Sequence, residues 1–365
     1  MIRADLELLE FPALLELVQR YVQTPEGRKR LLALRPHVRR EELETDLARA
    51  REAAEYLRAL ATPGKSTGLL RLDFGGIADL EPALTGLRVE GAELEPADIC
   101  AVLTLLDRAS DFKHILTGQR GRFPALAAAV SVVGEFRLLL RELGGKILPD
   151  GTLDDHASLE LWRLRREIEK QRKAIQDSLQ AFLRMHHEEG TLQEELVTIR
   201  NERFVVPVKA GARRRLDGVV HGASSTGHTL FIEPMETIEL NNELVSLTEE
   251  EQREIHRILR EMTARLREHG GGVQTALEAV TELDLAFAKA RFAADFDCVT
   301  PRFNSGQRLA LREARHPLLE EVLRRRGGRP AALEGGATKV VPLSLSLDGE
   351  NRVLVISGPN TGGKT

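Results

Sequence analysis

The residues with the most specific chemistry are the last ones of the chain, GPNTGGKT. They fit the pattern Gly-x-x-x-x-Gly-Lys-Ser/Thr and follow directly on the apolar run Val353–Ile356, which is typical of a buried strand. Glycines let the backbone approach an anion closely, so that successive N–H groups can cradle phosphate oxygens. The lysine would reach the β- and γ-phosphates, and the last hydroxyl would ligate Mg²⁺. The pattern therefore predicts a nucleotide-binding loop made of Gly358, Pro359, Asn360, Thr361, Gly362, Gly363, Lys364 and Thr365, with Mg²⁺ on Thr365.

The sequence stops at this loop. It contains no helix N-terminus after the loop to complete the anion site, and no later acidic residue to hold Mg²⁺ from a second strand. We therefore expect the chain to be a fragment without catalytic residues. Alone it should bind nucleotide weakly or not at all, and hydrolyse nothing.

A second group of candidate residues is basic, although the chain has a formal net charge of −4. Residues from about 196 to 236 alternate like short strands broken by glycine and proline turns. An arginine run can be a solvated turn, and that alternative stays open. Its place on an insert between two long helical stretches favours contact with a nucleic-acid backbone. The candidate residues are Arg200, Arg203, Lys209, Arg213, Arg214 and Arg215.

The insert lies between two stretches, 158–187 and 239–269, in which apolar residues recur at intervals of three and four. The expected seam of the first stretch is Leu161, Leu164, Ile168, Gln171, Ile175, Ser178, Phe182 and Met185. That of the second is Leu240, Leu244, Leu247, Ile255, Ile258, Met262 and Leu266, with a stop at Gly270–Gly272. Two long helices around a short insert should return antiparallel and form an arm with a small domain at its tip.

The remaining elements are mostly helices. Thr24 is expected to cap a helix that has Pro25 in its first position. A further helix should follow the arm, with Val273, Leu277, Val280, Phe287 and Ala294 facing inward. The segment KVVPLSLSL is a strand candidate. Aromatic residues make up only 4% of the chain, so we expect a largely aliphatic core of helices packed on helices.

Composition excludes several classes of protein. The cysteines, Cys100 and Cys298, give neither a disulfide framework nor a metal spacing, which favours a reducing cytosol. The acidic start of the chain has no signal-peptide pattern, and no apolar run is long enough for a bilayer. We therefore expect a cytoplasmic protein without a membrane segment.

In chain order, the segments ELDLAFAKARFA, ARHPLLE, VVPLSLSL and VLVISGPNTGGKT resemble the start of the ATPase domain in the MutS family of DNA-binding ATPases. RNERFVVPVKAG, GVVHGASSTGHTLFIEPMETIELNNEL and DDHASLELWRLRREI are similar to clamp and lever segments of its second bacterial branch, MutS-two. Like that branch, the chain starts in the lever region, and Phe231–Glu233 is interpreted as part of a strand and not as a mismatch wedge. Leu159 departs from the family, which has proline there, and this bears on the start of the first long helix.

The resemblance implies a mainly α fold: a helical core and lever domain with a long antiparallel coiled-coil arm, a small β-rich clamp tip, and the first strands of a truncated α/β P-loop ATPase domain. It implies the following division: first part of the core/lever domain 1–157, arm with clamp tip 158–270, returning core helix 271–300, and start of the ATPase domain 301–365. Val340 resembles the family position that packs on adenine.

The family resemblance also implies a function. It implies a homodimer that binds ATP and Mg²⁺ and encloses branched or duplex DNA, suppresses homologous recombination and carries an endonuclease domain beyond this sequence. Some members instead split collided ribosomes and contact ribosomal RNA, and the residues do not choose between these substrates. For the fragment alone, a non-catalytic nucleic-acid-binding module is the third interpretation.

Overall fold

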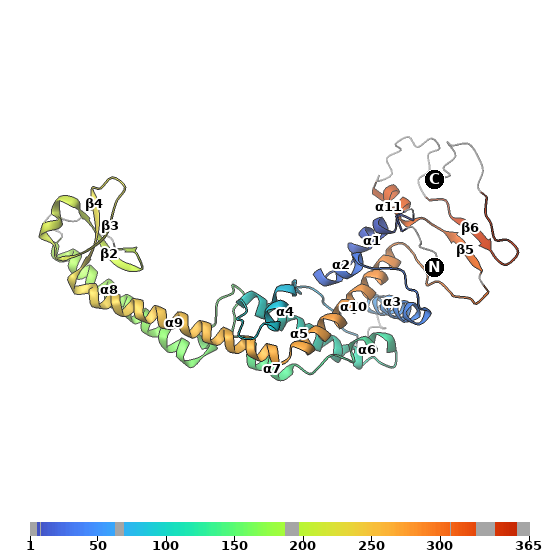
Figure 1. The fold of residues 1–365 in the computed structure, drawn as a ribbon, viewed down its shortest axis with the longest axis horizontal. Coiled ribbons are helices and arrows are strands. Elements are labelled where there is room, and N and C mark those ends of the chain that lie inside the picture. Colours follow the sequence, from blue (N-terminus) through green and yellow to red (C-terminus); the bar gives the residue numbers. More distant parts are fainter. Residues whose placement is uncertain are drawn as a thin grey trace. The chain divides into compact units, whose positions relative to one another are not determined.

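The computed structural model describes residues 6–7, 9–62, 69–186, 197–306, 308–325 and 340–355, apart from the side chains of residues 213–215. The chain divides into two compact units. Unit 1 comprises residues 1–79, 104–135 and 272–365, and unit 2 comprises residues 80–103 and 136–271. Helices dominate, and the strands form small antiparallel sheets, which confirms the mainly α class (Figure 1).

Unit 1 is a group of helices with a two-stranded sheet. Its elements are α1 (Phe11–Gln19), α2 (Pro25–Leu32), α3 (Arg40–Ala61), α6 (Pro124–Val130), α11 (Pro317–Arg325), β5 (Leu309–Ala314) and β6 (Leu343–Leu347), together with most of α5 (Pro96–Thr117) and α10 (Gly270–Asp295). The buried side chains of this unit are mostly aliphatic, as the composition predicted, and they include a few aromatic rings. The few aromatic rings meet there, with centroids 4.8 Å apart for Phe74 and Phe112 and 5.2 Å apart for Tyr56 and Phe123.

The predicted cap of α2 is confirmed and has a tertiary partner. The hydroxyl of Thr24 accepts a hydrogen bond from the N–H of Gly27 at 3.1 Å, and Pro25 occupies the first turn. The same hydroxyl donates to the carboxylate of Asp284 in α10 at 2.7 Å. Asp284 is fully buried and also accepts the backbone N–H of Thr24 at 2.8 Å, so the carboxylate joins the start of α2 to α10.

Unit 2 contains two long helices that run antiparallel. Its helices are α4 (Glu81–Arg88), α7 (Arg137–Leu143), α8 (Leu159–His186) and α9 (Met235–Glu268). Three contacts give the direction: Ser158 bonds to Glu254, Arg165 to Glu251, and Gln171 to the carbonyl of Leu240. The residue numbers of the partners on α9 thus decrease as those on α8 increase, which means that the helices are antiparallel. Figure 1 shows the two helices side by side.

The buried stripe of these helices differs in places from the predicted seam. Gln171 fits as a polar seam position, because its amide donates to the carbonyl of Leu240 at 2.9 Å. Near the end of α8 the stripe passes through Leu179 and Leu183, while Met185 is 65% exposed, so the prediction for Met185 was wrong. The reason is geometric: a straight helix with 3.6 residues per turn drifts away from a strict heptad repeat.

The glycine run after α9 does not form a loop. The break falls at His269, which has φ −104° and ψ 10°, and Gly270–Gly272 form the first turn of α10. Packing outweighs the low helix propensity of glycine here, because Val273 and Leu277 directly after it are buried. Ala294 at the far end of α10 is exposed, contrary to the prediction.

The strand expected before the nucleotide-binding loop is absent from the described residues. β5 and β6 pair antiparallel, which confirms a strand in KVVPLSLSL. Residues 351–355 have no strand geometry, and Val353 and Val355 are 79% and 81% exposed. A parallel strand needs neighbours and burial on both faces, and no described strand offers them. In the part of the chain that is described, no helix has the length and apolar character to cross a membrane.

Candidate nucleic-acid interface

The predicted β-rich insert is a four-stranded antiparallel sheet within unit 2. Its strands are β1 (Thr198–Arg200), β2 (Arg203–Lys209), β3 (Gly218–Ala223) and β4 (Thr229–Pro234), in the order β1-β2-β4-β3. Figure 1 shows this sheet at one end of the α8–α9 pair. The chain leaves α8, builds the sheet and returns into α9, as the change of sequence period predicted.

Local sequence explains the shape of the sheet. Asn201 and Glu202 both have positive φ, which is the geometry of a tight two-residue hairpin between β1 and β2. Pro207 lies where β1 no longer pairs with β2, so its missing N–H faces no second neighbour. Gly218 allows β3 to approach β4, because a Cβ there would lie 2.4 Å from the carbonyl oxygen of Glu233.

One face of the sheet shares a core with the ends of the two long helices. This core contains Phe182 and Leu183 of α8, Val206, Val208 and Ile232 of the sheet, and Leu244 and Leu247 of α9. Burying each such side chain contributes about 1.5–3 kcal/mol. The sheet is therefore packed onto the helix pair as one hydrophobic unit.

A polar contact adds direction to this packing. Asn241 of α9 is fully buried, and its side-chain oxygen accepts the backbone N–H of Phe204 at 3.0 Å. Its amide nitrogen donates to the carbonyl of the same residue at 3.1 Å. Asn241 thus satisfies both backbone groups of Phe204, as a neighbouring strand would.

A buried carboxylate organises the basic residues of the sheet. Glu233 of β4 is 1% exposed, and one of its oxygens accepts a hydrogen bond from Arg203 at 2.8 Å. Its other oxygen lies 2.6 Å from Nε2 of His221. His221 sits at a β-bulge between Val220 and Gly222, and such an irregularity can redirect a side chain.

The candidate basic residues of the sheet therefore fall into different environments. Arg203 bonds to Glu233 and also donates to the side chain of Asn242 at 2.5 Å, so its guanidinium already has protein partners, although its side chain is 23% exposed. Arg200 is exposed at the end of β1 and stacks over the ring of Phe231, with 4.4 Å from Cζ to the ring centroid. Lys209 is exposed at the end of β2.

The arginine run follows β2 directly. Arg213, Arg214 and Arg215 belong to the 3₁₀ helix η2 (Ala210–Arg215), and their side chains lie outside the described residues. The flanking residues Ala212 and Leu216 are buried in the shared core. The backbone of the run is thus anchored on both sides, and its contact with phosphate stays a prediction.

Sequence reasoning missed the residues that hold this sheet in place. Glu233 lies on β4, and Asn241 and Asn242 lie on α9. Their partners lie elsewhere in the sequence: Arg203 and Phe204 on β2, and His221 on β3. The only available signal was the presence of polar residues at positions where the helical or strand period calls for burial. The predicted nucleotide-binding loop, Gly358–Thr365, lies outside the described residues. Val340 lies three residues before the start of β6 and is not part of a helix or strand.

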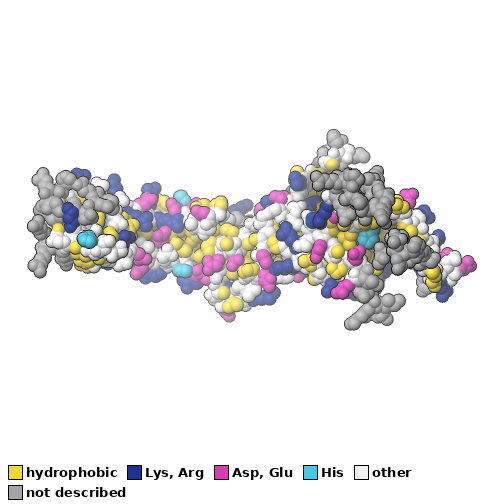
Figure 2. Space-filling view, turned by 90° about the horizontal axis from the view of Figure 1, so that it is seen from above, with side chains coloured by type: hydrophobic (Ala, Val, Ile, Leu, Met, Phe, Trp, Pro, Cys, Tyr) yellow, Lys and Arg dark blue, Asp and Glu magenta, His cyan; other side chains and the backbone are white. Residues whose placement is uncertain are grey.

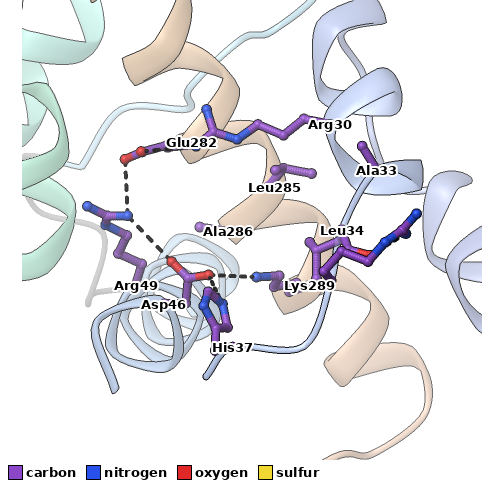
Figure 3. A pocket seen from close by; sticks show the side chains of 11 residues that line it. Arg30, Ala33, Leu34, His37, Asp46, Arg49, Glu282, Leu285, Ala286 and Lys289 are labelled. Carbon is purple, nitrogen blue, oxygen red and sulfur yellow. Dashed lines mark hydrogen bonds and ion pairs between the residues drawn. The ribbon is translucent and has the colours of Figure 1, made fainter. Parts of the chain in front are cut away.

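A second polar site lies within unit 1 and is shown in Figure 3. It is a cavity of about 280 Å³ between α2, α3 and α10. Asp46 lies 2.9 Å from Nε2 of His37 and 3.6 Å from Nζ of Lys289, and Glu282 lies 3.0 Å from Arg49 and 3.5 Å from Arg30. Opposite charges pair throughout this network, so we assign it to joining the three helices. The described residues contain no cluster of side chains suited to a metal ion.

The comparisons with known proteins agree with the predicted family. No model of a protein family matches the chain. An Endonuclease MutS2 of Thermus thermophilus is 36% identical over 363 residues, which are 100% of this chain and 43% of that protein. The Endonuclease MutS2 of Pelotomaculum thermopropionicum is 33% identical over 364 residues, and that of Bacillus velezensis is 32% identical over 363 residues. These alignments cover 99% of this chain and 42% and 43% of those proteins.

The chain is therefore a protein of the MutS class. It belongs to the MutS2 branch of that family, which confirms the resemblance found in the sequence. It spans about two fifths of the length of the relatives that it matches.

Proposed function

We propose that this chain is the lever and clamp part of a dimeric MutS-like ATPase that binds branched or duplex DNA. In the whole protein, this binding serves the suppression of homologous recombination and is coupled to an endonuclease activity. The name Endonuclease MutS2 of the relatives supports the nuclease part of the proposal. In this chain, the α8–α9 pair is the coiled-coil arm and the four-stranded sheet is the clamp tip.

The observation that carries the proposal is a basic segment whose flanking residues are buried in the core of the sheet. Arg200 and Lys209 are exposed at strand ends, and Arg213–Arg215 follow β2 between the buried Ala212 and Leu216. Cations at fixed positions can neutralise phosphates without reading the base sequence. Arg203 is excluded from this role by its bonds to Glu233 and Asn242, so the proposal rests on the other basic candidates.

The nucleotide part of the proposal rests on the donor set of Gly358–Thr365. Its backbone N–H groups, the ammonium of Lys364 and the hydroxyl of Thr365 fit a triphosphate with Mg²⁺. Val340 is the proposed contact of the adenine ring. ATP and Mg²⁺ supply the phosphoryl-transfer chemistry when bound.

The test is the salt dependence of DNA binding. We expect replacement of Arg213, Arg214 and Arg215 by alanine to weaken binding to a four-way junction and to a plain duplex alike. Each lost phosphate contact reduces the slope of log affinity against log salt by about 0.9, so the slope should fall by about two to three. Fluorescence anisotropy of labelled DNA at several KCl concentrations measures both quantities.

The matched control removes the same number of charges elsewhere. Arg51, Arg58 and Arg137 are exposed on α3 and α7 and have no carboxylate partner among the described residues. Their replacement by alanine should leave the slope unchanged. A tip variant that behaves like this control contradicts the clamp. If the unmodified chain binds purified ribosomes and ignores DNA, the partner is ribosomal RNA and the DNA proposal is wrong.

A further inference from the structure

The outward face of α8 carries a row of cations that the proposed clamp does not use. Arg166, Lys170 and Lys173 are exposed and follow one another at intervals of four and three, so they share one face of the helix. That face is opposite the stripe through Leu164 and Ile168, which is buried. None of the three cations pairs with a carboxylate among the described residues.

An aromatic ring extends this row by one turn. Trp162, the only tryptophan of the chain, is 38% exposed, and Cζ of Arg166 lies 5.5 Å from its ring centroid. A half-exposed indole beside a row of cations offers both stacking and charge. Arg163, nearby on the helix, is already neutralised by Glu160 and Glu167.

The neighbouring helix has the opposite charge at the same level. Between residues 235 and 252, α9 contains no lysine or arginine. Its acidic residues there are Glu236, Glu239, Glu243, Glu249, Glu250 and Glu251. The contacts of Arg165 with Glu251 and of Gln171 with Leu240 place this acidic stretch beside the basic row. Of these acidic residues, Glu251 pairs across the two helices, and Glu239, Glu243 and Glu249 are exposed.

Between residues 163 and 173, α8 has six basic residues against Glu167 and Glu169, whereas the neighbouring stretch of α9 has only acidic ones, so the two sides of the helix pair differ in the sign of their net charge. Acidic and basic side chains are interspersed over the face seen in Figure 2, and the difference in charge is one between the two helices. From Arg166 to Lys173 the row spans about 10 Å of helix axis, at 1.5 Å per residue. One strand of duplex DNA carries about three phosphates over that distance. Three cations thus face about three negative charges.

We infer that the α8 side of the helix pair is a second nucleic-acid contact, through which Arg166, Lys170 and Lys173 bind a phosphate backbone, and that the α9 side is turned away from it. The inference rests on the proposed function, and it adds the orientation of the arm. A nucleic acid that approached α9 would meet the exposed carboxylates of Glu239, Glu243 and Glu249 and be repelled. The acidic side of a second copy is the competing occupant of the basic row, and the spacing and the tryptophan favour the nucleic acid over it.

The experiment measures how the binding of three variants of the chain to a labelled 30-base-pair duplex depends on salt concentration. The α8 variant is Arg166→Ala, Lys170→Ala and Lys173→Ala. The control for charge is the Arg51, Arg58 and Arg137 variant, and the control for location is Glu239→Gln, Glu243→Gln and Glu249→Gln on α9. We expect the α8 variant to lower the salt slope by about two to three and both controls to retain the slope of the unmodified chain. All replaced residues lie at the surface, and circular dichroism checks the helix content of each variant.

The outcomes separate this inference from the proposed function. If the unmodified chain binds no nucleic acid, the proposed function is wrong and the inference fails with it. If the unmodified chain binds duplex and the α8 variant keeps its slope, the inference alone is overturned. If the α8 variant changes only the sedimentation of the protein, the basic row joins two copies, and the inference is again wrong.

Discussion

At the scale of single residues, the most consequential side chain in the sheet is Glu233. Its carboxylate is buried and is shared by Arg203 and His221. We expect Glu233→Ala to destabilise unit 2 by about 3 kcal/mol. The change removes a buried carboxylate and leaves the side chains of Arg203 and His221 without this partner. Hydrogen exchange of the β2–β4 amides measures the loss locally, and urea unfolding measures it globally.

The control for Glu233 is a glutamate of the same sheet without buried partners. Glu202 is exposed in the β1–β2 turn. Glu202→Ala should leave the exchange rates of β2 and β4 unchanged. Equal protection in both variants would show that the Glu233 contacts contribute nothing to the sheet.

The sequence could not predict the Glu233 contacts. The pattern correctly gave strands around His221 and Glu233, since alternation and turn residues are local signals. Which side chains meet depends on strand register, and the bulge at His221 shifts that register by one residue. By contrast, the cap formed by Thr24 was predictable, because a cap and its helix are adjacent in the sequence.

At the scale of elements, a connected series of hydrogen bonds stabilises the start of α8. Ser158 caps the helix by accepting the N–H of Leu161 at 3.0 Å, and its hydroxyl donates to Glu254 at 2.6 Å. Arg257 donates to both oxygens of this carboxylate, at 2.7 and 2.8 Å. The hydrogen bonds from Arg257, and then that from Ser158, lower the pKa of Glu254 below its usual value, against the effect of burial.

The lowered pKa of Glu254 predicts a dependence of stability on pH. A carboxyl group with a lower pKa in the folded state stabilises the protein above its unfolded pKa, about 4.3, and this contribution is lost as the pH falls through the folded pKa. We expect Glu254→Gln to reduce the free energy of unfolding by about 1 kcal/mol at pH 7, since Arg257 is half exposed. The difference should shrink in acid, below about pH 4. Glu261→Gln, which removes an exposed partner of the same arginine, is the control in denaturant unfolding from pH 7 to pH 3.

The family's proline position at the start of α8 gives another prediction. The structure begins α8 at Leu159 all the same, and Leu159 is 84% exposed in the first helical position. Ser158 has φ −148° and ψ 158°, which is the conformation that proline requires of the residue before it. We expect Leu159→Pro to stabilise the protein by about 0.4–1 kcal/mol by restricting the unfolded chain. Thermal unfolding tests this, with Leu161→Pro, inside the helix, as the destabilising comparison; a fall in Tm for Leu159→Pro contradicts it.

At the scale of the whole molecule, the segment before the nucleotide-binding loop bears on nucleotide affinity. Val353, Leu354 and Val355 are exposed and form no strand. Since the described residues before the loop form no strand that could support it, we expect this chain to bind Mg²⁺–ATP with a Kd of about 1 mM or weaker. Isothermal titration calorimetry measures this Kd, and a micromolar value would contradict the expectation. In a protein of the relatives' full length, Lys364→Ala should abolish ATP turnover, because it removes the charge placed on the transferred phosphate.

The larger organisation was predictable to different degrees in different places. Periodicity predicted the two long helices and the sheet between them, because each is a continuous local pattern. The strand at residues 353–356 was predicted from its apolar letters alone and fails over the described residues, since a parallel strand depends on neighbours elsewhere in the sequence. The end of the second long helix before the glycines was predicted correctly, but the glycines at 270–272 belong to the next helix, because propensity says nothing of the packing that follows them.

The paired bonds between Asn241 and Phe204 have a mechanical consequence. They fix the first turns of α9 to β2, so the sheet cannot rotate about the helix without breaking both. α9 has 34 residues and is therefore about 50 Å long, at 1.5 Å per residue. Over that length, a tilt of α9 by about one degree about its Glu268 end displaces the sheet by about 0.9 Å. The sheet and α9 therefore move together. A rotation of α9 at Glu268 is transmitted to the sheet through the bonds of Asn241.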